Sequence, residues 1–237
     1  MKITYIRHSG FLAELDGLYL LFDYIKGPLP ELSEDKDLLV FVSHRHEDHF
    51  SPAIWDLADC YPRIRYILSD DIWQNQVPDR HFCRTEFMDP GMTLTLEEGG
   101  GTRITAFHST DEGVAFLAES GGHTLFHAGD LNNWRWSGES KAWNNNMNAN
   151  YHRELEKIRE YGIVPEAAML PLDGRQEEWF CLGLHEFMET VGAGTVFPMH
   201  FWEDFSIIRR LKELPRSEAY RDRIADIREE GQSFLLA

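Results

Sequence analysis

Residues 38–49 read LLVFVSHRHEDH, an apolar run that passes directly into a cluster of histidine and acidic side chains. The run 38–43 has the length and composition of a fully buried strand. The end of a strand is a rigid place from which to aim side chains, because sheet hydrogen bonds fix its backbone. Ser51 and Pro52 then indicate the start of a helix, since serine caps free amides and proline suits the first helical position.

The spacing within this cluster predicts metal binding. In a locally extended chain, His44 and His46 point the same way and can share one ion, while Asp48 and His49 can reach a second ion beside it. Imidazole and carboxylate donors suit zinc, manganese or iron, and a site without thiolates is unlike a purely structural zinc site. The alternative is a solvated polar loop, which the specificity of the spacing disfavours.

Three further candidates follow β-like runs elsewhere in the chain. His108 closes the run ITAFH, Asp130 closes FHAGD and His200 closes TVFPMH. A lone histidine after a strand is more often an ordinary surface residue. Together with the cluster at 44–49, these residues make four strand-end sites in one chain. That number favours a shared site, and we expect all four to converge at one edge of a sheet.

The order His-x-His-x-Asp-His, a distant His, Gly-Asp and Pro-x-His resembles the metallo-β-lactamase superfamily from about residue 3 to residue 200. The opening Arg7-His8-Ser9-Gly10, together with Phe22-Asp23, resembles the branch that contains L-ascorbate-6-phosphate lactonase. The resemblance implies an α/β fold, a four-layered αβ/βα sandwich, with the site at one edge between two sheets.

The resemblance also implies a set of ligands for two divalent ions, with zinc expected first and manganese or iron as alternatives. One ion takes His44, His46 and His108; the other takes Asp48, His49 and His200; Asp130 bridges the two. The two ions are expected to activate a water molecule as the nucleophile. Asp48 and Asp130 are the expected catalytic residues, because either carboxylate can accept a proton during the cycle.

Four neighbours are expected to support the metal ligands or to contact the substrate. Asp23 matches an early strand-end aspartate of the family and would orient the ligands. His8 and His127 either contact the substrate, support the ligands, or are ordinary strand histidines. Arg175 follows an apolar strand and either binds an anionic group or is an exposed turn arginine.

The function that this combination predicts is a metal-dependent hydrolase acting on a small-molecule lactone, ester or phosphorylated substrate. A phosphodiesterase of the same fold remains an alternative. So does an iron-binding enzyme of redox or sulfur metabolism with the same ligand set. A non-catalytic metal-binding protein is a third alternative, which the complete ligand set disfavours.

Composition narrows the partners and the location. The chain has 237 residues with 40 acidic against 23 basic side chains, a net charge of −17, which disfavours a nucleic-acid partner. The three cysteines are widely spaced and odd in number, so they do not form a disulfide framework. No apolar run reaches the length of a membrane span. We expect one cytoplasmic domain over residues 1–237, with a homo-oligomer possible.

Periodicity predicts the remaining elements. Alternating or apolar runs predict further strands at 2–6, 11–15, 18–22, 64–68, 92–96, 102–107, 113–118, 123–127 and 195–198. Helical spacing predicts a helix through Tyr151, Leu155 and Ile158 that ends at Gly162, another near 187–191, and a third from Phe205 that stops near Pro215.

Residues 132–150 contain seven asparagines and three tryptophans, an unusual composition for a plain connection. Asparagine tolerates left-handed turns, and tryptophan supplies large apolar faces. Three interpretations stay open: a lid over a partly polar small molecule, a subunit contact, or an irregular surface loop.

Overall fold

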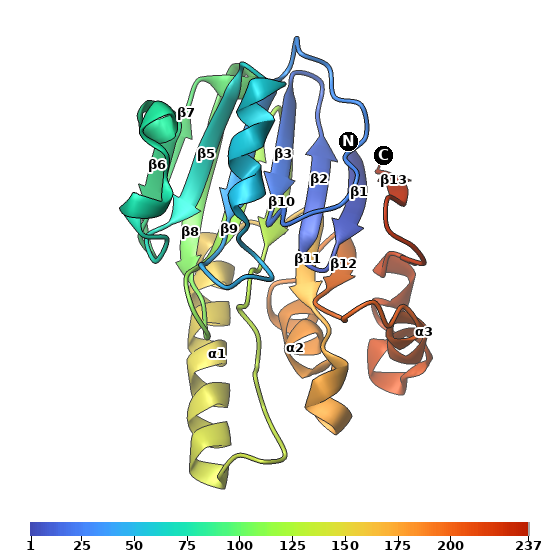
Figure 1. Ribbon diagram of the computed structural model, residues 1–237. Coiled ribbons are helices and arrows are strands. Elements are labelled where there is room, and N and C mark those ends of the chain that lie inside the picture. Colours follow the sequence, from blue (N-terminus) through green and yellow to red (C-terminus); the bar gives the residue numbers. More distant parts are fainter. Residues whose placement is uncertain (237) are drawn as a thin grey trace.

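The computed structural model describes residues 1–236 and contains two β-sheets that face each other, with helices on their outer sides (Figure 1). The first sheet has the strand order β13-β1-β2-β3-β4-β5-β6 and the second β12-β11-β10-β9-β8-β7. This is the α/β sandwich that the resemblance implied. The strands are β1 (Lys2–Arg7), β2 (Gly10–Glu14), β3 (Leu18–Phe22), β4 (Asp37–Val42), β5 (Ile64–Ser69), β6 (Thr85–Met88), β7 (Thr93–Leu96), β8 (Thr102–His108), β9 (Val114–Ser120), β10 (His123–His127), β11 (Ala167–Pro171), β12 (Thr195–Met199) and β13 (Ser233–Leu235).

Three α-helices and several short 3₁₀ helices connect the strands. The α-helices are α1 (Lys141–Tyr161), α2 (Leu182–Thr190) and α3 (Ser206–Glu213). The 3₁₀ helices are η1 (Pro52–Asp59), η2 (Gln74–Gln76), η3 (Asp79–Arg84), η4 (Glu98–Gly100), η5 (Gly174–Trp179), η6 (Pro215–Ser217) and η7 (Arg221–Arg223). Within residues 1–236, the helices fall short of the combined length and apolarity that crossing a membrane requires.

The continuous apolar run of β4 is explained by burial on both faces. Leu39 and Phe41 belong to the core that also contains side chains of the second sheet. Val40, from the opposite face, belongs to a second core with Ile54 and Trp55 of η1. Because side chains alternate across a strand, a strand covered on both sides has no polar positions.

Every strand predicted from periodicity is present within one or two residues of its expected bounds. The Asp16-Gly17 turn joins β2 and β3 as an antiparallel hairpin, and the amide of Leu15 donates to the carbonyl of Leu18 at 2.8 Å. β6 and β13 were not predicted. Both are short edge strands with little burial, so they carry no clear hydrophobic period.

The helices follow the predicted signals, with two differences. The element after Ser51 is the 3₁₀ helix η1, in which Ser51 Oγ accepts from the amide of Ala53. α1 ends at Gly162 in the left-handed conformation as expected, but it begins at Lys141 rather than near residue 151. Half of the asparagine-rich segment is therefore helical, and α1 extends well beyond the edge of the sheets (Figure 1).

Candidate metal centre

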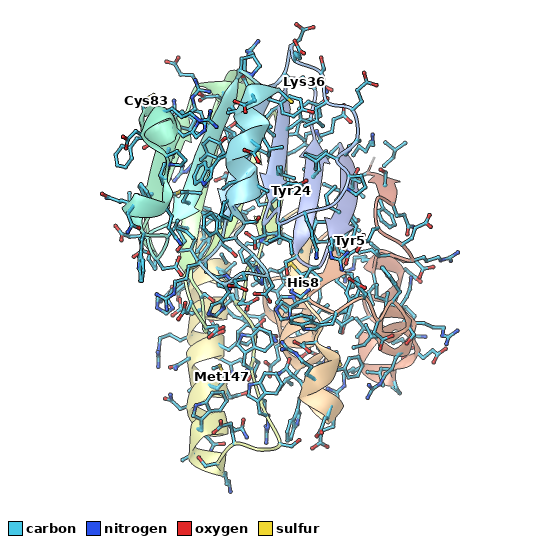
Figure 2. All side chains as sticks on the ribbon, in the orientation of Figure 1. Tyr5, His8, Tyr24, Lys36, Cys83 and Met147 are labelled. Atoms are coloured by element: carbon cyan, nitrogen blue, oxygen red, sulfur yellow. The ribbon has the colours of Figure 1, made fainter. Side chains whose placement is uncertain are left out.

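The predicted strand-end residues gather around the carboxylate of Asp130, which follows β10. Asp130 Oδ1 lies 3.2 Å from His49 Nε2 and 3.6 Å from His200 Nε2, and Asp130 Oδ2 lies 3.7 Å from His44 Nε2. His44 follows β4 in the first sheet, whereas His200 follows β12 in the second. The two sheets thus bring their ends together at one edge, close to His8 in Figure 2.

The donor atoms form overlapping groups in which every member lies within 4.8 Å of the others. The groups are His8, Asp48, His49 and His200; His44, His46 and Asp48; His44, His49 and Asp130; and His46, Asp111 and Asp130. Asp130 is shared between two of the groups and faces a third through His200. This arrangement has the donors and the spacing to hold two neighbouring cations.

The chemistry of these atoms fits metal ions. Among the described residues, His8 Nε2, His49 Nε2 and Asp130 Oδ1 are buried and have no hydrogen-bond partner. Leaving a buried polar atom without a partner costs free energy, and coordination to a cation removes that cost. His49 belongs to one donor group with His8 and to another with Asp130, so the three unpartnered atoms belong to adjoining groups of possible ligands.

The charges around Asp130 are arranged for a cation. Burial, together with neighbouring His49, lowers the pKa of His44 to about 3, so its imidazole is neutral and its lone pair is available. Burial favours a neutral Asp130, but the positive charges of His49 and His200 outweigh it and hold the pKa of Asp130 below its ordinary value. Burial also disfavours a charged His200. The nearby carboxylates outweigh this effect, with Asp130 contributing most among them, and raise the pKa of His200 to about 9. Positive charge is therefore favoured between these side chains.

Asp23, which the resemblance implied as an orienting residue, contacts the histidine cluster. It is buried, accepts from the amide of Ser43 at 2.8 Å and from Ser43 Oγ at 2.6 Å, and lies 2.7 Å from His49 Nδ1. A carboxylate on one ring nitrogen fixes the orientation of the ring and directs the other nitrogen toward the centre. The position of Asp23 thus aims His49 Nε2 at Asp130.

His127 and His8 occupy different places. His127 is fully buried; its Nδ1 accepts from the amide of Gly129 and its Nε2 lies 2.8 Å from the carbonyl of Ser9. It therefore supports the backbone and does not face the cavity. His8 Nε2 lies 3.3 Å from Asp48 Oδ2, close enough to join the ligand groups.

The structure does not bring His108 into the cluster. His108 is exposed, pairs with Val114 of β9 and lines a separate cavity of about 470 Å³ with Tyr161 of α1. The turn after β8 instead carries Asp111 to the centre, where Asp111 Oδ2 lies 3.9 Å from His46 Nδ1. Sequence spacing pointed to the histidine because it closes the strand, but the ladder to β9 holds that residue in the sheet.

Asp173, which the sequence analysis did not single out, also lies at the centre. Its buried carboxylate lies 3.0 Å from His200 Nδ1 and accepts from the backbone amide of Arg175 at 2.9 Å. The available signal was its place directly after the buried strand β11 and Leu172. That is the same pattern that identified Asp130 and His200.

Three site residues adopt backbone conformations that non-glycine residues rarely adopt. The φ angles of His8, Asp23 and His200 are 50°, 43° and 63°. Such conformations cost free energy and persist only where the surroundings impose them, typically at functional sites.

Close packing of the two sheets at this edge depends on glycine. A Cβ atom on Gly113, whose φ is +67°, would lie 2.0 Å from the carbonyl oxygen of Ser43 and 2.6 Å from Cβ of His44. One on Gly129 would lie 2.7 Å from Cβ of Ser43. These glycines allow the β9 and β10 ends to approach the histidine cluster.

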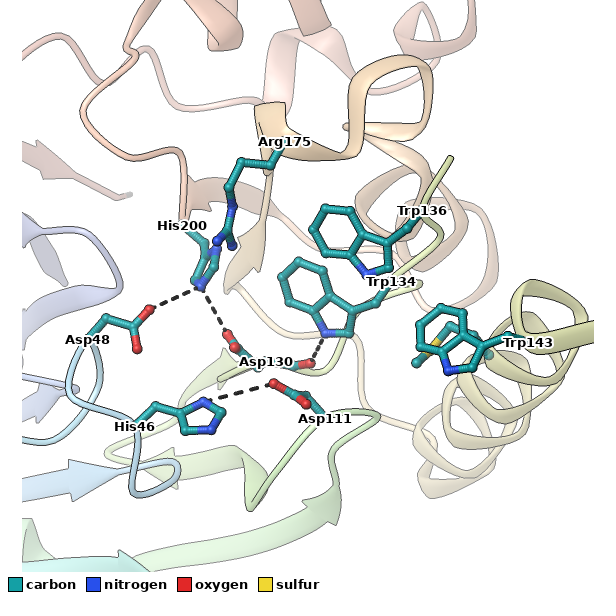
Figure 3. A pocket seen from close by; sticks show the side chains of 10 residues that line it. His46, Asp48, Asp111, Asp130, Trp134, Trp136, Trp143, Arg175 and His200 are labelled. Atoms are coloured by element: carbon teal, nitrogen blue, oxygen red, sulfur yellow. Dashed lines mark hydrogen bonds and ion pairs between the residues drawn. The ribbon is translucent and has the colours of Figure 1, made fainter. Parts of the chain in front are cut away.

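A cavity of about 360 Å³ opens directly onto the centre (Figure 3). Its lining residues are His46, Asp48, Asp111, Asp130, Trp134, Trp136, Trp143, Met147, Arg175 and His200. One wall is thus polar and metal-binding in character, and the other is largely aromatic. The guanidinium of Arg175 stands at the wall, where Asp173 holds it through Nε at 2.9 and 3.0 Å.

Known proteins resemble this chain in sequence and in fold. Residues 2–143 match the beta-lactamase superfamily domain. A UPF0173 metal-dependent hydrolase of Methanosarcina barkeri is 27% identical over 100% of this chain and 99% of that protein, and one of Pyrobaculum neutrophilum is 26% identical over 96% and 99%. The structure of Igni18, a metallo hydrolase from Ignicoccus hospitalis, superposes with a TM-score of 0.68 at 20% identity, covering 100% of this chain and 99% of that one. The chain belongs to the family of beta-lactamase superfamily domains, and it has the metallo-β-lactamase fold.

Proposed function

We propose that this metal-dependent hydrolase holds two divalent ions and cleaves a small-molecule lactone or ester. The observation that carries the proposal is that buried, unpartnered donor atoms of His8, His49 and Asp130 belong to adjoining groups of imidazole and carboxylate ligands. His44, His46 and Asp111 would hold one ion, and Asp48, His49 and His200 the other, with Asp130 between them. His8 lies beside the second set.

Such ions, when bound, polarise the electrophilic oxygen and lower the pKa of a water molecule. The residues of the chain orient the metal ligands and transfer the proton. Asp23 and Asp173 orient His49 and His200, so that the ring nitrogens facing the centre stay in place. Asp48, whose side chain is about one third exposed and lines the cavity, is placed to pass a proton between the centre and solvent.

The cavity favours an uncharged carbonyl substrate over a phosphorylated one. Its volume suits a small molecule. Arg175 is the arginine that lines it, and Asp173 already neutralises the charge of that guanidinium. The resemblance of residues 7–10 to the branch that contains L-ascorbate-6-phosphate lactonase supports cleavage of a lactone, and it does not separate a plain lactone from a phosphorylated one. Imidazole and carboxylate donors suit zinc, manganese or iron, and we propose zinc as the resident metal.

The test is a substrate panel on protein of measured metal content. Zinc- and manganese-reconstituted protein is assayed with lactones, carboxylic esters and phosphodiesters, beside His46→Ala as the metal-deficient control. The expected result is turnover of a lactone or ester that disappears in His46→Ala while the circular dichroism spectrum is retained. Turnover of phosphodiesters alone would overturn the substrate proposal. Bound iron with visible absorption and no hydrolysis would instead favour the redox alternative.

A further inference from the structure

We propose that Trp136, Trp143 and Met147 form an aromatic subsite that binds a flat, uncharged aromatic group of the substrate. The proposal names a substrate class for the hydrolase function proposed above and rests on it. The three side chains line the cavity. In Figure 3, Trp136 and Trp143 lie on the other side of the cavity from His46. A molecule whose carbonyl lies at the metal centre would therefore have its next group against this wall.

Trp143 offers partly exposed aromatic surface to the cavity. It lies in the first turn of α1, and its side chain is 37% exposed although it is large and apolar. Met147, one turn later on the same helix, also lines the cavity. Exposed aromatic surface inside a concave site is typical of ligand recognition, because burying it against a ligand is favourable.

The wall is fixed before any ligand binds. The amide of Trp136 donates to Asn144 Oδ1 at 3.0 Å, and Asn144 Nδ2 donates back to the carbonyl of Trp136 at 2.9 Å. This pair of bonds joins the 131–140 segment to α1 and sets the distance between Trp136 and Trp143. A preorganised wall loses little conformational freedom on binding.

Trp134 has a different role and is not part of the subsite. It is nearly fully buried, and its Nε1 donates to the backbone carbonyl of Asp130 at 2.8 Å. Its ring is parallel to that of Trp136, with 5.9 Å between centroids. Trp134 thus supports Asp130 on one side and the ring of Trp136 on the other.

The charges of the wall select an uncharged ring. The guanidinium of Arg175 already lies 4.7 Å from the ring centroid of Trp202 and 5.9 Å from that of Trp136, which disfavours a second cation there. An anionic group gains little, since Asp173 neutralises Arg175. Tryptophan faces attract aromatic rings in offset or edge-to-face arrangements beyond their burial alone.

The experiment measures binding of product-like acids to zinc-loaded protein by calorimetry. Phenylacetate is compared with acetate, with cyclohexylacetate of similar bulk, and with trimethylglycine, in which a quaternary ammonium cation takes the place of the ring. We expect phenylacetate to bind at least tenfold tighter than acetate and severalfold tighter than cyclohexylacetate. Trp143→Ala should remove most of that preference, Trp143→Phe should keep most of it, and zinc content should stay the same in both. Trp73→Ala, at an exposed tryptophan outside the cavity, is the matched control.

The outcomes separate the subsite from the hydrolase proposal. Equal affinity for phenylacetate and cyclohexylacetate, tighter binding of trimethylglycine, or an unchanged preference in Trp143→Ala would each overturn the aromatic subsite. A protein that hydrolyses acetyl and phenylacetyl esters equally well would also lack the subsite, while the hydrolase function would stand. A Trp143-dependent preference for phenylacetate in a protein that hydrolyses no lactone or ester would leave the subsite intact and overturn the function.

Discussion

The carboxylate of Asp173 lies 3.0 Å from Nδ1 of His200, and it also accepts from the backbone amide and side chain of Arg175. Nε2 of the same histidine ring faces Asp48 and Asp130 at 3.6 Å each. Asp173 therefore holds the ring in the orientation that directs Nε2 at the centre. It acts on the site through His200 and without facing the ions.

Asp173→Asn should weaken metal binding. Carboxylates that orient a ligating histidine typically contribute about 10- to 100-fold in metal affinity or activity. We expect a loss of that size in zinc affinity, measured by competition with a chromophoric chelator, with unfolding little changed. Asp222→Asn, at an exposed aspartate in η7, is the control. Equal zinc affinity in both variants would show that His200 keeps its orientation without Asp173.

Asp130→Asn should reduce turnover more than Asp173→Asn does. Asp130 faces His44, His49 and His200 directly, and an amide cannot supply the same negative charge between two cations. The comparison is of kcat at saturating zinc on the best ester of the panel. Equal, mild effects of the two substitutions would remove Asp130 from the centre.

Asp111→Ala should lose metal, whereas His108→Ala should not. Asp111 belongs to a donor group with His46 and Asp130, while His108 lines a different cavity. Metal analysis after gel filtration should give about one equivalent less for Asp111→Ala and the wild-type value for His108→Ala. The reverse pattern would restore the ligand that the sequence resemblance implied.

Gly113→Ala should destabilise the fold. The new Cβ would overlap the carbonyl of Ser43, and the left-handed backbone adds strain. Together these effects cost at least about 2 kcal/mol of unfolding free energy. Gly121→Ala has a similar φ, +59°, but no neighbour within 4 Å of the added atom, so it isolates the backbone effect. The free energies of unfolding of the metal-free variants are compared by urea unfolding. Equal midpoints for the two variants would show that the contact between Gly113 and Ser43 adapts to the extra Cβ without loss of stability.

The fold was largely predictable because its strands are buried and its turns carry clear signals. The buried strand in the run 38–43 and the helix end at Gly162 both appear as expected. The facing of two sheets was implied only by the resemblance, since periodicity reports which side of a strand is apolar and not what covers it. The early start of α1 was missed because its first turns are rich in asparagine, a poor helix former.

The candidate site was predictable where a candidate ligand closely follows a strand. It was not predictable where a turn or a contact with a distant segment determines which side chain faces the centre. Asp130 and His200 lie where the strand-end pattern placed them. The prediction took His108 in place of Asp111. The pairing of β8 with β9 and the turn at Gly113 determine that Asp111, and not His108, reaches the edge of the sheets. Asp173 was missed because its role depends on contact with His200, and a contact between distant segments has no local signature.

Metal content distinguishes a two-metal centre from a histidine and carboxylate cluster that holds no metal. Wild-type protein and His46→Ala are stripped with chelator, reconstituted with zinc, freed of excess metal and analysed for zinc per chain. The account predicts close to two equivalents for the wild-type protein and a clear deficit for His46→Ala with retained secondary structure. Wild-type protein that repeatedly retains no zinc, and no manganese when reconstituted with it, would contradict the account.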